Sequence, residues 1–373
     1  MTAITPRSIP FFNYAGAFAA EEDTYIGIFR DILRRGAFIQ QRDLVEFEAR
    51  LAAYLGVNHA IGVGNATDGL LMAFRAAGIK PGDEVIFPSH TMVASPASAA
   101  QCGGVPVPVD CRDDHLIDPA AIERAITPRT RFLLPVHLNG RTCDMDAITA
   151  MAKQHNLTII EDAAQGLGSK FRDRYAGTWG LAAAYSFYPA KILGCMGDGG
   201  AIVTNDAGIA HRIRLLRDHG RDEVGEVMMW GLNSRLDNLQ AAILDHQFKD
   251  YQTIIDRRRT IASLYQQELG DVTQLTLPPA PGSDPDHYDT FQNYEIEADR
   301  RDELKAFLKD RDIGTLIQWG GKAVHQFHAL GFKVSLPNTE RMFQRCLMIP
   351  MNLTLSDEDA RYVAGVIREF YGC

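Results

Sequence analysis

Lys191 lies in a sequence context that is typical of covalent cofactor chemistry rather than of a solvated surface lysine. Before it, residues 158–165 form an apolar run that leads into Asp162 and Gln165. After it comes a glycine-rich turn at residues 197–200. A lysine amine can hold pyridoxal phosphate (PLP) as a Schiff base, while a carboxylate pairs with the pyridinium nitrogen of that cofactor. We therefore predict a PLP site around Lys191.

Three polar side chains near this lysine could contact the ring or the phosphate of such a cofactor. Asp162 ends a strand of β-branched residues, so its carboxylate is expected to face a crevice and to keep a pyridinium nitrogen protonated. Gln165 could hydrogen-bond the phenolic oxygen, and Ser186 could reach the phosphate. The alternatives are that Asp162 caps a helix or pairs with Arg172 or Arg174, and that Ser186 satisfies only its own backbone.

A second candidate site lies between a predicted strand at 59–64 and a predicted helix at 68–77. Thr67 and Asp68 stand at the start of that helix, so their backbone N–H groups could bind a phosphate. Thr and Asp are also ordinary N-caps, so this motif alone fits local capping equally well. It is neither a Walker A loop nor a GxGxxG fingerprint, which argues against nucleoside triphosphates and NAD.

The segments that must position these residues alternate between strand-like and helix-like patterns. Such alternation predicts an α/β architecture with a largely parallel sheet. Ligands bind beyond the carboxyl ends of strands in such sheets, which is where the polar clusters fall. The predicted helices span 21–35, 43–55 and 68–77, and the predicted strands span 59–64, 84–87, 105–109, 131–136 and 157–160.

The pattern changes after residue 232. Further elements are predicted there: one nearly continuous helix at 236–269, a Pro-rich loop at 277–282, a strand at 292–296 and helices at 300–311 and 356–371. Ser356 is the expected N-cap of the last helix. We therefore predict a large domain at 1–250 and a smaller α+β domain at 251–373.

The composition excludes several classes of partner. The 373-residue chain has a formal charge of −9, and its only basic triplet, Arg257-Arg258-Arg259, is interpreted as a solvated helix face or a dimer contact, so no nucleic-acid partner is expected. The six cysteines show no metal-like spacing, which predicts free thiols in a reducing cytosol and no metal site. Residues 1–15 lack a secretory pattern, and no apolar run approaches the roughly 20 residues of a membrane helix. We expect a cytoplasmic protein without a membrane partner.

Several motifs follow one another in a fixed order along the chain: NATDGL at 65–70, PGDEV at 81–85, PVHLNG at 135–140, EDAAQ at 161–165, SFYPAK at 186–191, GDGG at 197–200 and NSRLD at 233–237. In these motifs the chain resembles the DegT/DnrJ/EryC1/StrS family of PLP-dependent aminotransferases, which mostly act on keto sugars. The likeness extends from Phe47 to about Pro350. The resemblance implies a fold-type I aminotransferase, with a large domain of mainly parallel sheet and a smaller α+β C-terminal domain.

The resemblance also implies a role for each matching residue. Lys191 would be the Schiff-base lysine, Asp162 the partner of the ring nitrogen, and Gln165 a contact to the ring oxygen. A homodimer with shared active sites would be part of the mechanism. The phosphate would be held by Ser186, by the backbone of Thr67 and Asp68, and by the partner subunit's Asn233.

This chain departs from the family pattern on the cofactor face and on the substrate side. Met92 stands where an aromatic residue usually stacks on the cofactor ring, so we expect a thioether contact there. The alternatives are that Met92 belongs only to the core and that His90 stacks on the ring instead. Gln40-Gln41 replaces a glycine-containing turn that often borders the sugar site.

A third departure is the segment 318–322, which replaces the family's usual His-Tyr-Pro stretch, whereas His325 keeps a familiar histidine position. Trp319 offers a flat apolar face and Lys322 a positive charge suited to a diphosphate. The alternatives are that Trp319 belongs to the core and that Lys322 is solvated.

The sequence therefore predicts a PLP-dependent transaminase of amino-sugar and polysaccharide biosynthesis. The expected reaction moves an amino group from an amino acid, with glutamate as the expected donor, to a nucleotide-linked keto sugar. One alternative is a PLP-dependent sugar dehydratase, but such relatives carry histidine in place of Lys191. The other alternative is a non-catalytic regulatory protein on the same scaffold.

Overall fold

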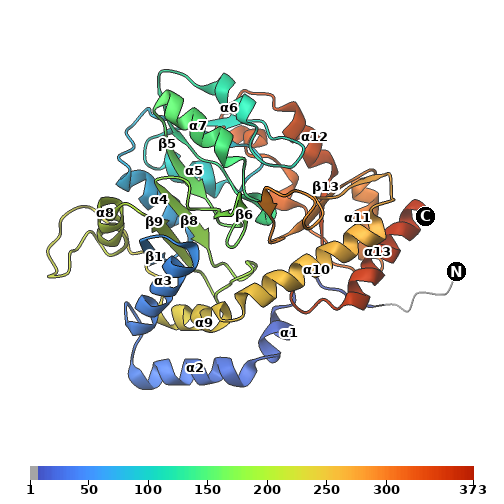
Figure 1. Ribbon diagram of the computed structural model, residues 1–373, viewed down its shortest axis with the longest axis horizontal. Coiled ribbons are helices and arrows are strands. Elements are labelled where there is room, and N and C mark those ends of the chain that lie inside the picture. Colours follow the sequence, from blue (N-terminus) through green and yellow to red (C-terminus); the bar gives the residue numbers. More distant parts are fainter. Residues whose placement is uncertain (1–6) are drawn as a thin grey trace.

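The computed structural model describes residues 7–373 and contains a central seven-stranded sheet (Figure 1). Residues 1–6, which are part of the segment expected to lack a secretory pattern, lie outside the described residues. The strand order is β1-β9-β8-β5-β4-β2-β3, and β9 runs antiparallel to both of its neighbours, while the other pairs are parallel. The predicted α/β fold with a mainly parallel sheet is therefore confirmed. The strands are β1 (His59–Val63), β2 (Glu84–Pro88), β3 (Val105–Val109), β4 (Thr130–Leu133), β5 (Thr158–Asp162), β8 (Ala182–Ser186) and β9 (Gly200–Thr204).

Helices cover both faces of this sheet because alternate strand residues point to opposite sides. In β8, Ala182 and Ala184 belong to a core shared with α4 and α8, whereas Ala183 belongs to a core shared with α3 and α9. A third core joins the sheet to α6 and α7. The helices in this part of the chain are α1 (Tyr14–Ala19), α2 (Glu22–Arg35), α3 (Arg42–Leu55), α4 (Ala66–Ala76), α5 (Ala94–Ala100), α6 (Pro119–Ala125), α7 (Met145–His155), α8 (Ala207–Arg217) and α9 (Asn238–Phe248).

The C-terminal part is a smaller antiparallel sheet, β10-β12-β13, packed with helices that lie to the right in Figure 1. Ser356 caps its last helix as predicted, since Ser356 Oγ accepts the N–H of Asp359 at 3.0 Å. The predicted domain boundary after residue 250 stays a prediction. The elements here are β10 (Leu275–Thr276), β12 (Tyr294–Ala298), β13 (Cys346–Ile349), α10 (Tyr251–Leu269), α11 (Arg301–Lys309), α12 (Pro337–Arg345) and α13 (Asp357–Tyr371). A separate small sheet contains β6 (Lys170–Phe171), β7 (Arg174–Tyr175) and β11 (His287–Tyr288).

Two predictions about the segment after residue 232 are wrong. The single helix expected at 236–269 is broken into α9 and α10, which pack against different neighbours, α3 and α13. Arg258, expected on a solvated face or a dimer contact, is buried, and its guanidinium donates to the carbonyl oxygens of Phe291, Gln292 and Met351. It thus ties α10 to the loop before β12 and to the loop after β13.

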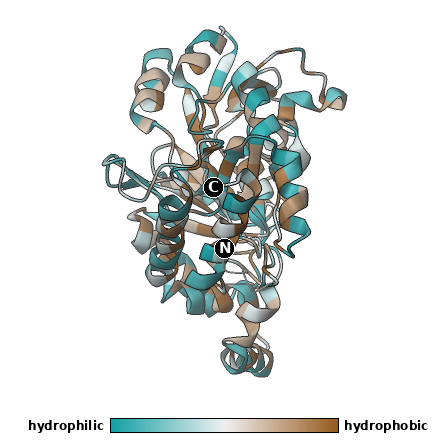
Figure 2. Ribbon diagram, turned by 90° about the vertical axis from the view of Figure 1, so that its right-hand side faces the viewer, coloured by the Kyte–Doolittle hydropathy of each residue, from teal (hydrophilic) through white to brown (hydrophobic). Residues whose placement is uncertain are grey.

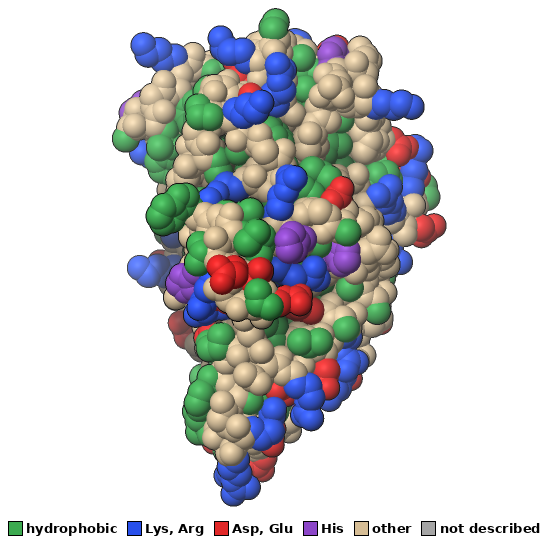
Figure 3. All heavy atoms as spheres, turned by 90° about the vertical axis from the view of Figure 1, so that its left-hand side faces the viewer, with side chains coloured by type: hydrophobic (Ala, Val, Ile, Leu, Met, Phe, Trp, Pro, Cys, Tyr) green, Lys and Arg blue, Asp and Glu red, His purple; other side chains and the backbone are tan. Residues whose placement is uncertain are grey.

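Residues of different polarity are mixed along the helices and on the face drawn in space-filling form (Figure 2 and Figure 3). The helices carry hydrophilic and hydrophobic residues together (Figure 2). On the face shown in Figure 3, lysine and arginine side chains are dispersed among acidic and hydrophobic ones rather than gathered in one patch. Within residues 7–373, no helix is both long and apolar enough to cross a membrane. The six cysteines are free thiols, as predicted.

Candidate active site

The side chains singled out around Lys191 meet at one edge of the central sheet. Asp162 is the last residue of β5 and Ser186 the last of β8, and these neighbouring strands run parallel. Their carboxyl ends therefore lie at the same edge. A small pocket at this edge is lined by Ala164, Gln165, Leu167, Ser186, Lys191, Ile192, Leu193, Tyr251 and Gln292.

The Asp162 carboxylate is buried and held in one orientation. Its Oδ2 atom accepts from the Ser95 hydroxyl at 2.6 Å, and its Oδ1 atom accepts from the N–H of Ala164 at 3.0 Å. The ion-pair alternatives are not realised, because Arg172 pairs with acidic residues other than Asp162, and Arg174 donates to the backbone of Thr178. The fixed carboxylate lies close enough to the Lys191 amine to favour its charged form.

Lys191 is partly buried in a turn after β8, and its backbone is clamped from both sides. The Gln292 side chain accepts the N–H of Ile192 at 2.9 Å and donates to the carbonyl of Ala190 at 2.8 Å. Burial lowers the pKa of the Lys191 amine to about 8, although the nearby Asp162 carboxylate opposes this shift. The neutral, nucleophilic form of the amine is therefore far more accessible than in an ordinary lysine.

Gln165 is oriented by two neighbouring amides. Its Oε1 atom accepts the backbone N–H of Asn139 at 2.8 Å and the side-chain N–H of Asn293 at 3.3 Å. Asn139 has a left-handed backbone with φ of 55°, a conformation that asparagine tolerates well. With its oxygen occupied, Gln165 can offer its NH₂ group to an acceptor in the pocket.

The phosphate candidates at the start of α4 are only partly free. Asn65, rather than Thr67 or Asp68, is the N-cap of α4, and its side chain accepts the N–H of Asp68 at 2.8 Å. The amide of Asp68 is therefore committed to capping, which leaves Thr67 as the better placed donor of the two. Ser186 accepts the N–H of Tyr188 at 3.3 Å through its oxygen, so its hydroxyl hydrogen remains available.

Two other cofactor candidates lie outside the small pocket of their own chain. Met92 is 47% exposed on the loop between β2 and α5, and Asn233 is exposed beside α8. Neither lines the pocket around Lys191. The alternative that His90 stacks on the cofactor is wrong, because its ring is fully buried against Phe343.

The candidate substrate residues do not gather in the Lys191 pocket either. Trp319 packs against two buried clusters, which supports the core alternative. Lys322 is exposed and borders a separate open groove together with His325. His325 is buried, and its Nδ1 lies 2.7 Å from the Ser89 hydroxyl.

Sequence reasoning missed the residues that hold the predicted ones in place. Ser95 donates to Asp162, Asn139 donates to Gln165, and Gln292 contacts the backbone on either side of Lys191, at Ala190 and Ile192. Ser95 and Gln292 carry no signal of their own, because both act from segments far away in the sequence. Asn139 lies in the motif PVHLNG at 135–140, and this motif is the signal that could have identified it.

The arrangement fits PLP. Four groups lie at the carboxyl ends of the parallel strands: the Lys191 amine with its lowered pKa, the fixed carboxylate of Asp162, the oriented amide of Gln165 and the hydroxyl of Ser186. When bound, this cofactor supplies an electron sink for bond changes at an amino-acid carbon. The fold and the site together define a PLP-dependent aminotransferase of fold type I.

The particular family follows from the whole chain. Residues 20–368 match the DegT/DnrJ/EryC1/StrS aminotransferase family, to which this chain belongs. The chain is 40% identical over 377 aligned residues to a dTDP-3-amino-3,4,6-trideoxy-alpha-D-glucose transaminase of Streptomyces venezuelae, with 99% of this chain and 97% of that protein covered. It is 36% identical over 363 residues to a UDP-N-acetyl-3-dehydro-alpha-D-glucosamine 3-aminotransferase of Acidithiobacillus ferrooxidans, with 97% of each covered.

A solved structure agrees with this assignment. The crystal structure of S. venezuelae DesV in complex with a ketimine intermediate superposes with a TM-score of 0.93 at 39% identity, covering 98% of this chain and 99% of that one. The predicted family, fold, enzyme class and cofactor are therefore confirmed.

Proposed function

We propose that this aminotransferase transfers an amino group from glutamate to a nucleotide-linked 3-keto sugar. The observation that carries the proposal is the coverage of nearly the whole chain by two relatives whose names place the amino group at carbon 3. Those relatives differ in their carriers, dTDP and UDP, so the ketone position is the shared feature. The reaction belongs to amino-sugar biosynthesis, and the six free thiols support a reducing, cytoplasmic setting.

Each pocket residue has a definite task in this proposal. Lys191 holds the cofactor covalently and afterwards, as a free amine, moves a proton between the donor carbon and the cofactor. Asp162, fixed by Ser95, supplies the negative charge opposite the ring nitrogen. Gln165 contacts the ring oxygen, and Thr67 and Ser186 bind the phosphate.

A homodimer completes the site in this proposal. Asn233 is exposed, so its side chain is accessible to a second copy of the chain. The segment before it exposes Val227, Met228 and Trp230, with Trp230 90% exposed. Large exposed apolar groups of this kind mark an interaction surface.

Helix α2 supports the same interface. It lies along the lower edge of the molecule in Figure 1 and exposes Ile26, Phe29 and Leu33. These residues are spaced by three and four positions, so they share one helix face. We propose that both apolar regions pack against a second copy, which brings the partner's Asn233 to the phosphate.

A screen of acceptors tests the reaction. The purified holoenzyme is given glutamate and, in separate reactions, dTDP- or UDP-linked 3-keto and 4-keto hexoses, and the amino sugar is detected by mass spectrometry. We expect product from 3-keto acceptors in preference to their 4-keto isomers. Preference for 4-keto acceptors would overturn the proposed position, and failure with every nucleotide-linked sugar would overturn the acceptor class.

A further inference from the structure

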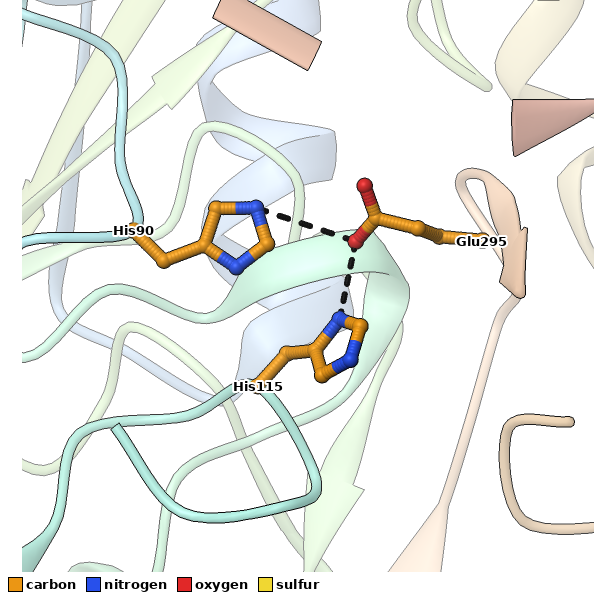
Figure 4. A group of neighbouring side chains, drawn as sticks. All are labelled: His90, His115 and Glu295. Carbon is orange, nitrogen blue, oxygen red and sulfur yellow. Dashed lines mark hydrogen bonds and ion pairs between the residues drawn. The ribbon is translucent and has the colours of Figure 1, made fainter. Parts of the chain in front are cut away.

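A second polar cluster lies beside the active site, around Glu295 of β12. Glu295 and Glu297 alternate along this strand with Tyr294 and Ile296, which belong to the C-terminal hydrophobic core. The two glutamates therefore face the other way, toward the large sheet. Figure 4 shows the rings of His90 and His115 turned toward the Glu295 carboxylate.

The distances within this cluster are those of a nearly formed metal site. His115 Nδ1 lies 2.9 Å and His90 Nε2 lies 3.7 Å from Glu295 Oε2. One ligand-type atom from each of the three residues lies within 4.8 Å of the others. Tetrahedral zinc with metal–nitrogen distances of about 2.0–2.1 Å brings its ligand atoms to about 3.3 Å from one another. Small side-chain movements would therefore close the shell.

Several buried atoms of the cluster lack a hydrogen-bond partner among the described residues. Both ring nitrogens of His90 are unpartnered, and so is Glu295 Oε1, although both side chains are almost fully buried. Buried polar groups are normally satisfied, and each exception needs an explanation. An ion at the centre of the cluster would engage one ring nitrogen of His90 and the carboxylate of Glu295.

Neighbouring side chains supply the outer contacts that metal ligands require. His115 Nε2 lies 3.3 Å from Glu297 Oε1, while its other nitrogen faces Glu295. Glu297 is in turn held by Arg341 at 2.6 Å and Arg345 at 3.1 Å. A carboxylate that receives the outer N–H of a ligating histidine fixes the orientation of the ring and raises its basicity.

We propose that His90, His115 and Glu295 form a binding site for one divalent transition-metal ion of the zinc type. Imidazole and carboxylate ligands suit such ions, and two histidines with one glutamate leave a coordination position open. His115 and Glu295 also line a cavity of about 310 Å³, together with Asn139 and Arg141. An oxygen-bearing small molecule in this cavity would take the open coordination position. The site does not depend on the acceptor proposed above.

Metal binding to the PLP-loaded enzyme tests the proposal directly. Untagged protein is treated with a chelator, dialysed against Zn²⁺, and analysed for metal per chain. We expect stoichiometric zinc that falls to background in His90→Gln and in Glu295→Gln. The matched control is His246→Gln, which disrupts the exposed pair of His246 with Glu21 and should leave the bound zinc unchanged. No bound zinc in the wild type, or equal zinc in the cluster variants, would overturn the proposal.

Two further measurements guard against misfolded variants. Co²⁺ added to the wild type should give the strong visible bands of a four- or five-coordinate site, whereas the weak spectrum of hydrated cobalt would overturn the assignment. Glu297→Gln keeps all three ligands and removes only the outer carboxylate. We expect it to weaken zinc affinity by about 10- to 100-fold, and an unchanged affinity would contradict the role of Glu297. The alternative is a metal-free ion pair of His115 with Glu295, in which case neither metal binds.

Discussion

The depressed pKa of Lys191 makes a quantitative prediction about how fast the protein attaches PLP. Burial lowers this pKa from 10.5 to about 8, and the Asp162 carboxylate limits the shift. Only the neutral amine attacks the aldehyde of the cofactor. At pH 7 about 10% of a group with a pKa of 8 is neutral, compared with about 0.03% for a pKa of 10.5, so attachment should be roughly 300-fold faster than for an ordinary lysine.

The direction of the pH dependence follows from the same argument. The attachment rate should rise with pH, reach half of its maximum near pH 8, and then level off, rather than continue to rise toward 10.5. Asp162→Asn removes the charge that favours the protonated amine. The midpoint in that variant should therefore move below 8.

The assay mixes apoprotein with PLP and follows the absorbance of the bound cofactor from neutral to alkaline pH. Borohydride reduction and peptide mapping then identify the labelled lysine. Lys153→Ala, at an exposed position of α7, is the control and should behave as the wild type. A wild-type midpoint near that of a free lysine, an upward shift in Asp162→Asn, or a label on another lysine would refute the reasoning.

Three further predictions concern turnover. Asp162→Asn should lower kcat by about 10²-fold or more, equivalent to about 2.7 kcal/mol of barrier, with the circular dichroism spectrum unchanged; near wild-type rates would make Asp162 merely structural. Inactive Lys191→Ala chains mixed with Asn233→Ala chains should regain activity, because one site of each hybrid dimer carries neither defect. Verified hybrids that stay inactive would mean that each chain builds its own phosphate site. Lys322→Ala should raise the KM for the sugar nucleotide severalfold and leave the glutamate half-reaction unchanged, and equal effects on both half-reactions would remove Lys322 from the acceptor site.

The elements that sequence periodicity could predict are those with one clear buried face. Strand β5 and helix α3 fall close to their predicted bounds, because their apolar residues follow a strand or a helix pattern without interruption. The break between α9 and α10 was not predicted, because Lys249 and Asp250 fit the helical periodicity of the sequence on both sides. The turn there is imposed by packing, since the two helices contact different parts of the molecule.

Candidate site residues could likewise be predicted only where a local sequence pattern marks them. Lys191 and Asp162 stand in contiguous motifs, so their chemistry was visible in the chain. The cluster of His90, His115 and Glu295 was not, because its members come from three segments that only the tertiary fold brings together. Cysteine and histidine spacing along the sequence therefore indicated no metal site.

Asn139 connects the pocket around Lys191 to the cluster of His90, His115 and Glu295. Its backbone N–H orients Gln165 in the cofactor pocket, and its side-chain NH₂ donates to Glu295 at 2.9 Å. Its side-chain oxygen accepts from Gln318 at 2.8 Å, a residue of the segment that departs most from the family pattern. A change in the position of Gln318 can therefore reach Gln165 through one asparagine. The residues at 318–322 can therefore differ from the family pattern while Lys191, Asp162 and Gln165 stay the same. Through Asn139, such differences change how Gln165 is oriented and not which side chains the pocket contains.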